Sequence, residues 1–472
     1  MNLNDYAKAD FICSCGKRHR TDIKEIIIDD NLFSCLMDVI HHLFGFLNQT
    51  EEINAEVAQN QTILMVSDER TWEAAGKYLA VQLERAGMAC RLMCFPAEPV
   101  LVPDEKAVFG VLNSMGPDIG LLMAVGSGTI NDLTRFVSHR ANVPYLIVAT
   151  APSMDGYASS VSSLVVNHMK QTFSAWGAEA IMAAPSILAA CPQIMIAAGL
   201  GDILGKYTAI SDWRLSNLIT GEHFCETVAN LVLDATHEVK QQSPMIALRE
   251  TTAVTGIFEA LIMTGIAMSY IGNSRPASGS EHHLSHYWEM SFLREGKPPV
   301  LHGSKVGLAT LMTCELYRYL PKLKPDFQKA RARAKCFDPD VWEKEMTCVY
   351  GEGAAEIIAI ERKAGKHDSA AVLDHLDQME AHWPEICELS CQTIPESSEI
   401  LDVLRQAGGP VHPEMIGISR NLLADSLRYA MEIRDRYTIL RLYDELGETE
   451  TAVGLIDHLF FTDNRRNSGP EK

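Results

Sequence analysis

The sequence predicts an α/β domain built on a parallel sheet, followed by an all-helical domain. Between residues 62 and 150, short apolar runs alternate with stretches of helical spacing, a pattern typical of β-α-β units. The apolar runs show no alternation with polar residues, as expected for strands that are covered on both faces. Beyond about residue 191 the apolar residues recur almost only at helical spacing. We therefore expect two domains, residues 1–190 and 191–472.

The expected elements follow in chain order. A strand over 23–28 and a helix over 31–46 come first, before the alternation begins at Thr62. Strands are then expected over 63–68, 89–95, 118–126 and 144–150, with helices over 69–87, 104–116 and 126–142 between them. In the second domain, helices are expected over 195–215, 225–240, 247–272, 306–320 and 419–447. Residues 327–395 match no motif that we can place.

Composition and charge restrict the class of protein. The chain has 472 residues, of which 47% are apolar, so it can bury a substantial core and intrinsic disorder is excluded. Its 41 Lys and Arg against 61 Asp and Glu give a net charge of −20, which argues against nucleic acid or an anionic membrane as a partner. No signal peptide or membrane insertion is expected, and the apolar stretch 255–272 is expected to be a buried helix. Twelve scattered cysteines are typical of reduced thiols in the cytoplasm.

A short motif near the N-terminus, CSCGKRH, leaves two interpretations open. Cys13, Cys15 and His19 could bind a metal ion. Alternatively, Gly16 makes a tight hairpin turn between two short strands, over 11–15 and 23–29. No second pair of ligands lies nearby in the sequence, which favours the hairpin.

A glycine turn follows the strand over 118–126 and opens a helix. Its first five residues are Gly126, Ser127, Gly128, Thr129 and Ile130. Glycines let the backbone approach a phosphate, and the start of a helix offers free N–H groups, so a Rossmann-like phosphate site is expected. Asn131 stands where the GxGxxG dinucleotide motif has its third glycine, and a purely structural turn remains the alternative.

A polar loop ends the next strand at the same edge of the predicted sheet. It contains Thr150, Ala151, Pro152, Ser153, Asp155 and Ser159. Its hydroxyl groups and its carboxylate are suited to ribose, phosphate or a polyol, although the same residues also occur in ordinary loops.

Polar residues inside apolar surroundings mark a candidate metal site in the helical domain. Asp202 is flanked by apolar residues, so its carboxylate must be a cap, paired or metal-bound. His282 and His286 lie four residues apart and share one helix face, and His302 precedes the start of another helix. One carboxylate and two imidazoles leave a coordination position open, as in catalytic sites, while each histidine alone is compatible with a structural role.

Five motifs in order, GSGTIND, TAPSMDGYAS, AAGLGDILGKYTA, SGSEHHLSH and LHGSKVG, carry a resemblance to a known family. The chain resembles the sn-glycerol-1-phosphate dehydrogenases, in particular their bacterial branch associated with arabinose operons. That family belongs with the iron-type alcohol dehydrogenases, glycerol dehydrogenase and 3-dehydroquinate synthase, which implies a dehydroquinate synthase-like fold. The resemblance extends over roughly residues 10–310, includes the N-terminal CSCGKRH motif as a shared element, and returns near RDRYTILRLYDELG.

The resemblance implies roles for the residues in these motifs. Gly126 to Ile130 would hold the pyrophosphate of NAD(H) or NADP(H), supported by Asp132. Thr150, Ala151, Pro152, Ser153 and Ser159 would also contact the cofactor. Asp202, His282 and His302 would bind one divalent metal, zinc or nickel. Asp155, Asp202 and His286 would contact a phosphorylated triose, and the catalytic set would be Asp202, His282, His286 and His302.

The implied activity is the interconversion of dihydroxyacetone phosphate and sn-glycerol 1-phosphate by a cytoplasmic homodimer. Lys206 and Lys305 are candidates for binding the substrate phosphate, because both lie beside metal-ligand segments. The strand over 89–95 meets no carboxylate before Glu98, so use of both NADH and NADPH is expected. The alternatives are a cyclising lyase like 3-dehydroquinate synthase, a polyol or glycerol dehydrogenase, and a catalytically silent binding protein.

Overall fold

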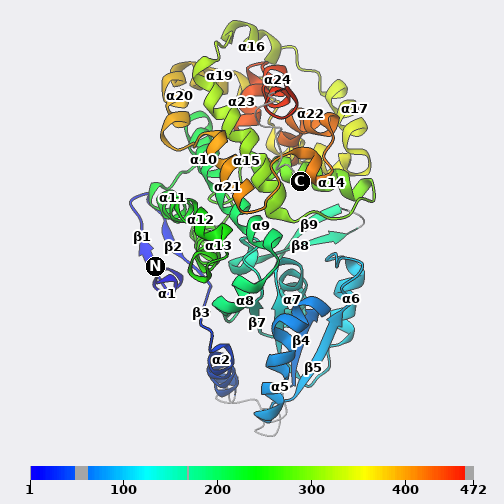
Figure 1. Cartoon of the computed structure of the whole chain (residues 1–472). Coiled ribbons are helices and arrows are strands. Elements are labelled where there is room, and N and C mark those ends of the chain that lie inside the picture. The colour runs from blue at the N-terminus through cyan, green and yellow to red at the C-terminus, as the bar shows by residue number, and fades with distance from the viewer. Residues whose placement is uncertain (1, 48–61, 167–168, 463–472) are drawn as a thin grey trace. The chain divides into compact units, whose positions relative to one another are not determined.

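The computed structural model describes residues 2–47, 62–166 and 169–462 (Figure 1). Its contacts divide the chain into two compact units, here called unit 1 (Met1–Gly199 and Gln241–Asn273) and unit 2 (Leu200–Lys240 and Ser274–Lys472). The domain limits 1–190 and 191–472 stay a prediction. The units differ from them because the segment Gln241–Asn273 packs with the N-terminal part of the chain.

Unit 1 contains a parallel sheet of six strands, as the sequence predicts. The strand order is β3-β10-β7-β6-β4-β5. These strands are β3 (Ile26–Ile28), β4 (Thr62–Asp68), β5 (Cys90–Phe95), β6 (Ile119–Gly126), β7 (Tyr145–Ala149) and β10 (Ile181–Ala183). In β4, Ile63 and Met65 pack into one core cluster, and Leu64 between them is also fully buried. Both faces of the sheet are therefore covered, which explains the continuously apolar strands.

Helices pack against the faces of this sheet. The core cluster on one face includes Leu36 of α2 (Leu32–Leu47) and Leu79 of α5 (Lys77–Arg85). The helix α7 (Gly128–Ala141) contacts β4, β6 and β7, and α6 (Glu105–Asn113) contacts α7. Because β4 lies between β5 and β6, the chain reverses its direction of travel across the sheet there. Ligands bind at the carboxyl ends of the strands beside such a switch point, which here are the ends of β4 and β6.

Two hairpins and one short strand differ from the prediction. The strand β1 (Asp10–Ile12) pairs with β2 (Arg18–Arg20), so the N-terminal hairpin does not use the expected second strand over 23–29. Residues 26–28 pair instead with β10 at the edge of the parallel sheet. The hairpin of β8 (Val161–Val166) and β9 (Met169–Ser174) and the strand β10 were not expected, because β10 is short, β9 is mostly polar and serines interrupt the apolar run of β8.

The apolar helix α13 (Thr251–Ile271) belongs to unit 1. It contacts α8 (Pro185–Ala190), the short helix η2 (Gly156–Ala158), β2 and α1 (Leu3–Ala7). A Cβ atom added at Gly265 would lie 2.5 Å from that of Ala158, so glycine permits this close approach. By length and composition alone α13 is able to span a membrane, but 67% of its apolar stretch is buried inside the protein, as in a core helix.

The described part of unit 2 is helical. Its longer helices include α10 (Lys206–Thr220), α14 (Ser280–Arg294), α15 (His302–Tyr319), α21 (Ser397–Gln406), α22 (Arg420–Tyr429), α23 (Ile439–Glu445) and α24 (Thr449–Asp457). The nearly fully buried α15 contacts α14, α20, α21 and α24. The stretch without a sequence motif forms α16 (Phe327–Ala334), α17 (Pro339–Tyr350), α18 (Ala354–Ala364), α19 (Ser369–Ala381) and α20 (Trp383–Gln392).

Candidate metal centre and nucleotide-binding turn

Close packing of the end of α9 against the start of α15 positions two of the predicted metal ligands. Asp202 lies near the end of α9 (Gln193–Leu204), and His302 is the first residue of α15. A Cβ atom at Gly201 would lie 2.4 Å from the carbonyl oxygen of Gly303, and one at Gly307 would lie 2.9 Å from the Cα atom of Gly201. The two glycines therefore let the helix backbones touch where Asp202 and His302 project.

The three predicted ligands converge. One donor atom each of Asp202, His282 and His302 lies within 4.8 Å of the others. The Nε2 atom of His282 is 3.2 Å from Nε2 of His302 and 3.8 Å from Oδ1 of Asp202. Asp202 and His282 are buried and His302 is partly buried. Residues from three helices, separated by up to 100 positions, thus form one cluster.

A carboxylate that the sequence analysis missed determines which nitrogen of His282 is available. The Nδ1 atom of His282 lies 2.7 Å from Oε1 of Glu281. Burial alone would raise the pKa of Glu281, but hydrogen bonds from His282, Thr208 and Gly279 hold this pKa below its usual value. An ionised carboxylate only accepts, so Nδ1 carries the proton and Nε2 keeps its lone pair for a metal.

Lys206 lies beside the third ligand. Its Nζ atom is 2.8 Å from Oδ1 of Asp202 and donates to the carbonyl oxygen of Ala277 at 3.1 Å. Both charged side chains are fully buried, so the pair offsets part of its own desolvation. Lys206 therefore supports a metal ligand here, whereas the sequence analysis considered it for a substrate phosphate.

The neighbouring His286 faces the same cluster. Its ring centroid is 5.9 Å from that of His302 and 6.2 Å from that of His282. Nδ1 of His286 is 3.5 Å from Oε2 of Glu289, and Nζ of the buried Lys305 is 3.4 Å from the same oxygen. Glu289, which the sequence analysis did not single out, thus joins the two side chains.

His283, the next residue on α14, belongs to a different environment. It is fully buried, and neither ring nitrogen has a hydrogen-bond partner among the described residues. Burial, together with Arg436, Arg434 and Arg275, holds the pKa of His283 well below its usual value, so the ring is neutral.

The donor set suits a catalytic divalent metal. One carboxylate oxygen and two neutral imidazole nitrogens are ligands that zinc, nickel and iron accept, and three protein ligands leave room for a substrate atom. The hydrogen bond between Glu281 and His282 is the outer support typical of such sites.

The predicted phosphate turn lies at the switch point of the sheet in unit 1. The strand β6 ends at Gly126 and α7 begins at Gly128, with Ser127 between them as the residue before the helix. A Cβ atom at Gly126 would lie 2.8 Å from that of Ile130, so the turn excludes larger residues. The backbone N–H of Thr150 donates to the carbonyl oxygen of Gly126 at 3.1 Å, which joins the turn to the following loop.

Arg135 of α7 holds this loop in place. Its buried guanidinium donates to the carbonyl oxygens of Gly156, Tyr157 and Val161. It also pairs with Asp132 at 3.0 Å. Burial raises the pKa of Asp132 to about 6, although Arg135 acts to lower it. Asp132 is thus linked through Arg135 to the loop after β7, and its expected support of the turn stays a prediction.

The loop after β7 also contains the other residues that were expected to contact the cofactor or the substrate. The hydroxyl group of Tyr157 donates to the carbonyl oxygen of Ala151, while Thr150 and Ser153 are nearly buried and Asp155 is partly exposed. The roles expected for Pro152, Ser153, Asp155 and Ser159 stay predictions.

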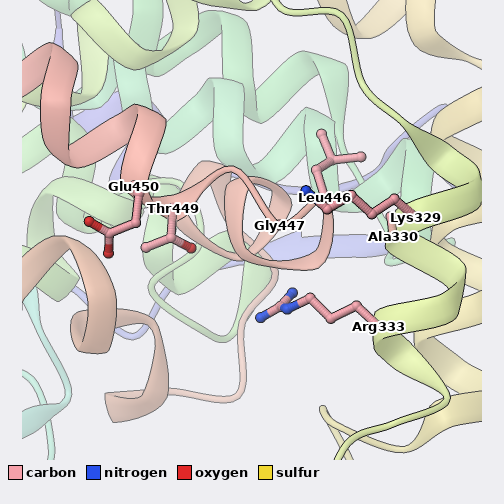
Figure 2. Close-up of a pocket in the computed structure, with 7 residues that line it drawn as sticks. All are labelled: Lys329, Ala330, Arg333, Leu446, Gly447, Thr449 and Glu450. Carbon is pink, nitrogen blue, oxygen red and sulfur yellow. The ribbon is translucent and has the colours of Figure 1, made fainter.

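A small pocket elsewhere in unit 2 contains none of the predicted site residues (Figure 2). It has a volume of about 180 Å³ and is lined by Lys329, Ala330, Arg333, Leu446, Gly447, Thr449 and Glu450. Arg333 turns its guanidinium toward Asp444, to which it is hydrogen-bonded at 2.7 Å.

The fold and the donor set have the features of a metal-binding nucleotide-dependent enzyme, and comparison with known proteins narrows this class. Residues 44–192 match the model of the iron-containing alcohol dehydrogenase family. A probable glycerol dehydrogenase from Sinorhizobium meliloti 1021 has a similar fold, with a TM-score of 0.56 at 14% identity over 92% of this chain and 98% of that one.

Curated relatives identify the family more closely. A glycerol-1-phosphate dehydrogenase (NAD(P)+) from Geobacillus thermodenitrificans is 32% identical over 437 residues, covering 91% of this chain and 95% of the relative. The enzyme of the same name from Geobacillus stearothermophilus is 31% identical over 92% of this chain and 96% of its own length. The chain belongs to the glycerol-1-phosphate dehydrogenase family.

Proposed function

We propose that the chain is an NAD(P)-linked oxidoreductase that interconverts dihydroxyacetone phosphate and sn-glycerol 1-phosphate. The observation that carries this proposal is the convergence of Asp202, His282 and His302 within 4.8 Å in a chain of this family. In the reducing direction, a hydride from C4 of the reduced nicotinamide forms a bond with carbon C2 of the ketone. The carbonyl oxygen takes up a proton, and oxidised NAD(P)+ is released.

The metal-binding residues determine how the ketone is held. A divalent metal, zinc or nickel, would supply Lewis-acid stabilisation of the negative charge that develops on the C2 oxygen. Glu281 keeps Nε2 of His282 unprotonated, and Lys206 balances the charge of Asp202 at 2.8 Å. These supporting contacts fix the ligands before substrate binds, which lowers the cost of reaching the reactive geometry.

Unit 1 would bind the dinucleotide. The backbone N–H groups at the start of α7 and the glycines of the turn Gly126 to Ile130 form the expected cradle for the pyrophosphate. Thr150 to Ser153 and Ser159 would contact the remainder of the cofactor. Asp155 would contact substrate. The supporting observations are the position of the turn at the switch point and the hydrogen bond from Thr150 that joins it to the loop after β7, which Arg135 anchors.

We assign substrate contact and proton supply to the neighbourhood of His286. Its ring lies beside the two metal-binding rings, and Glu289 contacts its Nδ1 atom at 3.5 Å. A histidine whose other nitrogen faces a carboxylate can hold a proton for a developing alkoxide or pass it through water.

The test is the consumption of reduced nicotinamide by the metal-loaded protein. Dihydroxyacetone phosphate is compared with unphosphorylated dihydroxyacetone and with a heptulosonate phosphate. We expect oxidation of NADH and NADPH with dihydroxyacetone phosphate and its loss after treatment with a chelator. No oxidation with that substrate would refute the proposal. A preference for dihydroxyacetone would indicate a polyol dehydrogenase, and turnover of the heptulosonate phosphate without net NADH consumption would indicate a cyclase.

We further propose a homodimer in the cytoplasm, as the family resemblance implies. The chain mass is 52.2 kDa, so sedimentation velocity separates a monomer from a dimer of twice that mass. A single monomeric species at micromolar concentration would contradict the dimer.

A further inference from the structure

The N-terminal hairpin of unit 1 brings together two thiols and an imidazole outside the site described above. Cys13 and Cys15 lie in its turn, and His19 lies on β2. One ligand atom from each of the three residues lies within 4.8 Å of the others. Cys13 and His19 are buried and Cys15 is partly buried, so these polar groups occupy a shielded position.

A backbone contact determines the orientation of His19. Its Nδ1 atom lies 2.9 Å from the carbonyl oxygen of Tyr270 at the end of α13. A carbonyl oxygen only accepts, so Nδ1 carries the proton and the lone pair is on Nε2. That Nε2 atom lies 3.4 Å from Sγ of Cys15. Metal-binding histidines typically donate one ring N–H to a carbonyl or carboxylate oxygen and direct the other nitrogen at the metal. His19 has this arrangement, with Nδ1 at a carbonyl oxygen and Nε2 beside a thiol.

Aromatic packing holds the ring in this position. The ring of Phe11 meets the rings of His19 and Tyr270 edge-on, with centroid distances of 5.4 and 5.6 Å. The hydroxyl group of Tyr270 in turn donates to the carbonyl oxygen of Tyr6 at 2.5 Å. The imidazole is therefore fixed from two sides before any ion binds.

The turn between the strands arranges the two cysteines. The N–H of Cys13 donates to the carbonyl oxygen of Lys17 at 2.9 Å, and that of Gly16 donates to the carbonyl oxygen of Cys13 at 3.0 Å. Gly16 has a φ of +83°, and nothing lies within 4 Å of the position of a Cβ atom there. Glycine is thus required by the backbone conformation rather than by space. The hairpin and the metal interpretations of the sequence are therefore compatible.

We propose that Cys13, Cys15 and His19 bind a zinc ion that ties the β1–β2 hairpin to α13. Two thiolates and a neutral imidazole are ligands that zinc prefers, and they occupy three of its four tetrahedral positions. A fourth ligand would complete the tetrahedron. Binding releases the two thiol protons, and the metal–ligand bonds then stabilise the folded N-terminal segment.

Sulfur ligation distinguishes this site from the catalytic one. The cluster of Asp202, His282 and His302 contains only oxygen and nitrogen donors. Tetrahedral Co²⁺ bound by thiolates has an intense charge-transfer band in the near ultraviolet, which Co²⁺ bound by oxygen and nitrogen lacks. The full-length protein, stripped of metal under reducing conditions and titrated with Co²⁺, therefore reports on the hairpin site alone.

We expect the wild-type protein to develop the charge-transfer band and to lose it on addition of Zn²⁺. The variant His282→Ala should keep the band, because His282 belongs to the other cluster, with Asp202 and His302. Cys15→Ser should lose most of the band, and Cys191→Ser is the matched control. Cys191 is another buried thiol of unit 1, hydrogen-bonded to the carbonyl oxygen of Pro192, and its replacement should leave the band unchanged.

The wild-type titration is decisive even if the cysteine variants do not fold. A folded wild-type protein with no sulfur-to-cobalt band would overturn the proposal. So would a band that persists unchanged in folded Cys15→Ser protein, or one that disappears in folded Cys191→Ser protein. None of these outcomes depends on catalytic activity, so the zinc site and the proposed function are tested separately.

Discussion

At the scale of residues, the metal centre depends on the charge state of groups that are themselves not ligands. Glu281 fixes the tautomer of His282, and Lys206 faces Asp202. Two of the three predicted ligands, His282 and Asp202, therefore each have one buried partner of complementary charge or hydrogen-bonding capacity. Removing a ligand should abolish metal binding, whereas removing a partner should only weaken it.

His282→Ala tests the ligand role directly. We expect the variant to lose bound metal and activity together while keeping the circular dichroism of the folded protein. The matched control is His283→Ala, since His283 is adjacent on α14 but offers no atom to the cluster. Metal content is measured by mass spectrometry after dialysis. An unchanged catalytic metal stoichiometry in folded His282→Ala protein would refute the assignment.

Glu281→Gln tests the positioning role of the carboxylate. The amide preserves size but can present either a donor or an acceptor to His282, so Nε2 is no longer held unprotonated. We expect metal affinity to fall by about 10- to 100-fold, measured by competition with a chromophoric chelator. Glu295→Gln at the exposed end of the same helix should bind metal as the wild type does. Equal affinity in all three proteins would contradict this role.

The sequence analysis singled out Asp202, His282 and His302, which the structure brings together, but it did not single out Glu281 or Glu289. Asp202, His282 and His302 were recognisable as polar residues in apolar surroundings and through the family resemblance. Glu281 and Glu289 were not, because a glutamate in a helix with mixed composition is most often exposed. The burial of Glu281 and the partial burial of Glu289 depend on contacts with α10 and α15, which no local pattern encodes.

At the scale of elements, the approach of α9 to α15 decides whether Asp202 reaches His302. Gly201→Ala places a methyl group 2.4 Å from the carbonyl oxygen of Gly303, so the helix backbones must separate. We expect a loss of about 1–3 kcal/mol in the free energy of unfolding, together with weaker metal binding.

The control for that variant is Gly454→Ala in α24. Nothing lies within 4 Å of an added Cβ atom there, so only the helix propensity changes. We expect a gain of about 0.5–1 kcal/mol and unchanged metal affinity. Denaturant unfolding and metal titration measure both quantities. If Gly201→Ala were as stable as the wild type and bound metal normally, close helix packing would not position the ligands.

The helix α7 anchors the loop after β7 through the side chain of Arg135. Arg135→Met leaves three carbonyl oxygens without their donor and Asp132 without its cation. We expect a loss of about 3–5 kcal/mol in unfolding free energy and a raised KM for NAD(P)H.

Arg140→Met on the same helix is the matched control for this variant. Arg140 is exposed and only stacks over the ring of Phe136 at 5.1 Å, so its loss should cost no more than about 1 kcal/mol. Equal stabilities of the two variants, measured by denaturant unfolding, would contradict the anchoring role of Arg135.

Periodicity predicted the long elements well and the short ones poorly. The strands β4 to β7 are continuous apolar runs beside helices, which is why they were recognisable. The strand β10 has only three residues, and polar residues make up most of β9 and interrupt the apolar run of β8, so neither feature was recognisable. The helix α13 is apolar on all sides and therefore gives no indication of which unit it joins.

At the scale of the whole molecule, the net charge of −20 has to be reconciled with an anionic substrate and cofactor. Backbone N–H groups at the start of α7 and a divalent metal on the three proposed ligands would supply positive potential locally, without a basic surface. The overall charge therefore excludes polyanions such as nucleic acids as expected partners while permitting small phosphorylated substrates.

The most direct test of the central claim follows the product of the reaction in chelator-stripped and metal-reloaded protein. We predict that the stripped protein leaves NADH and dihydroxyacetone phosphate unchanged. Reloading with zinc or nickel should restore stoichiometric oxidation of NADH. The product should be a glycerol phosphate that an sn-glycerol-3-phosphate-specific dehydrogenase does not oxidise. Full activity without metal, or a product that this second enzyme oxidises completely, would contradict the account.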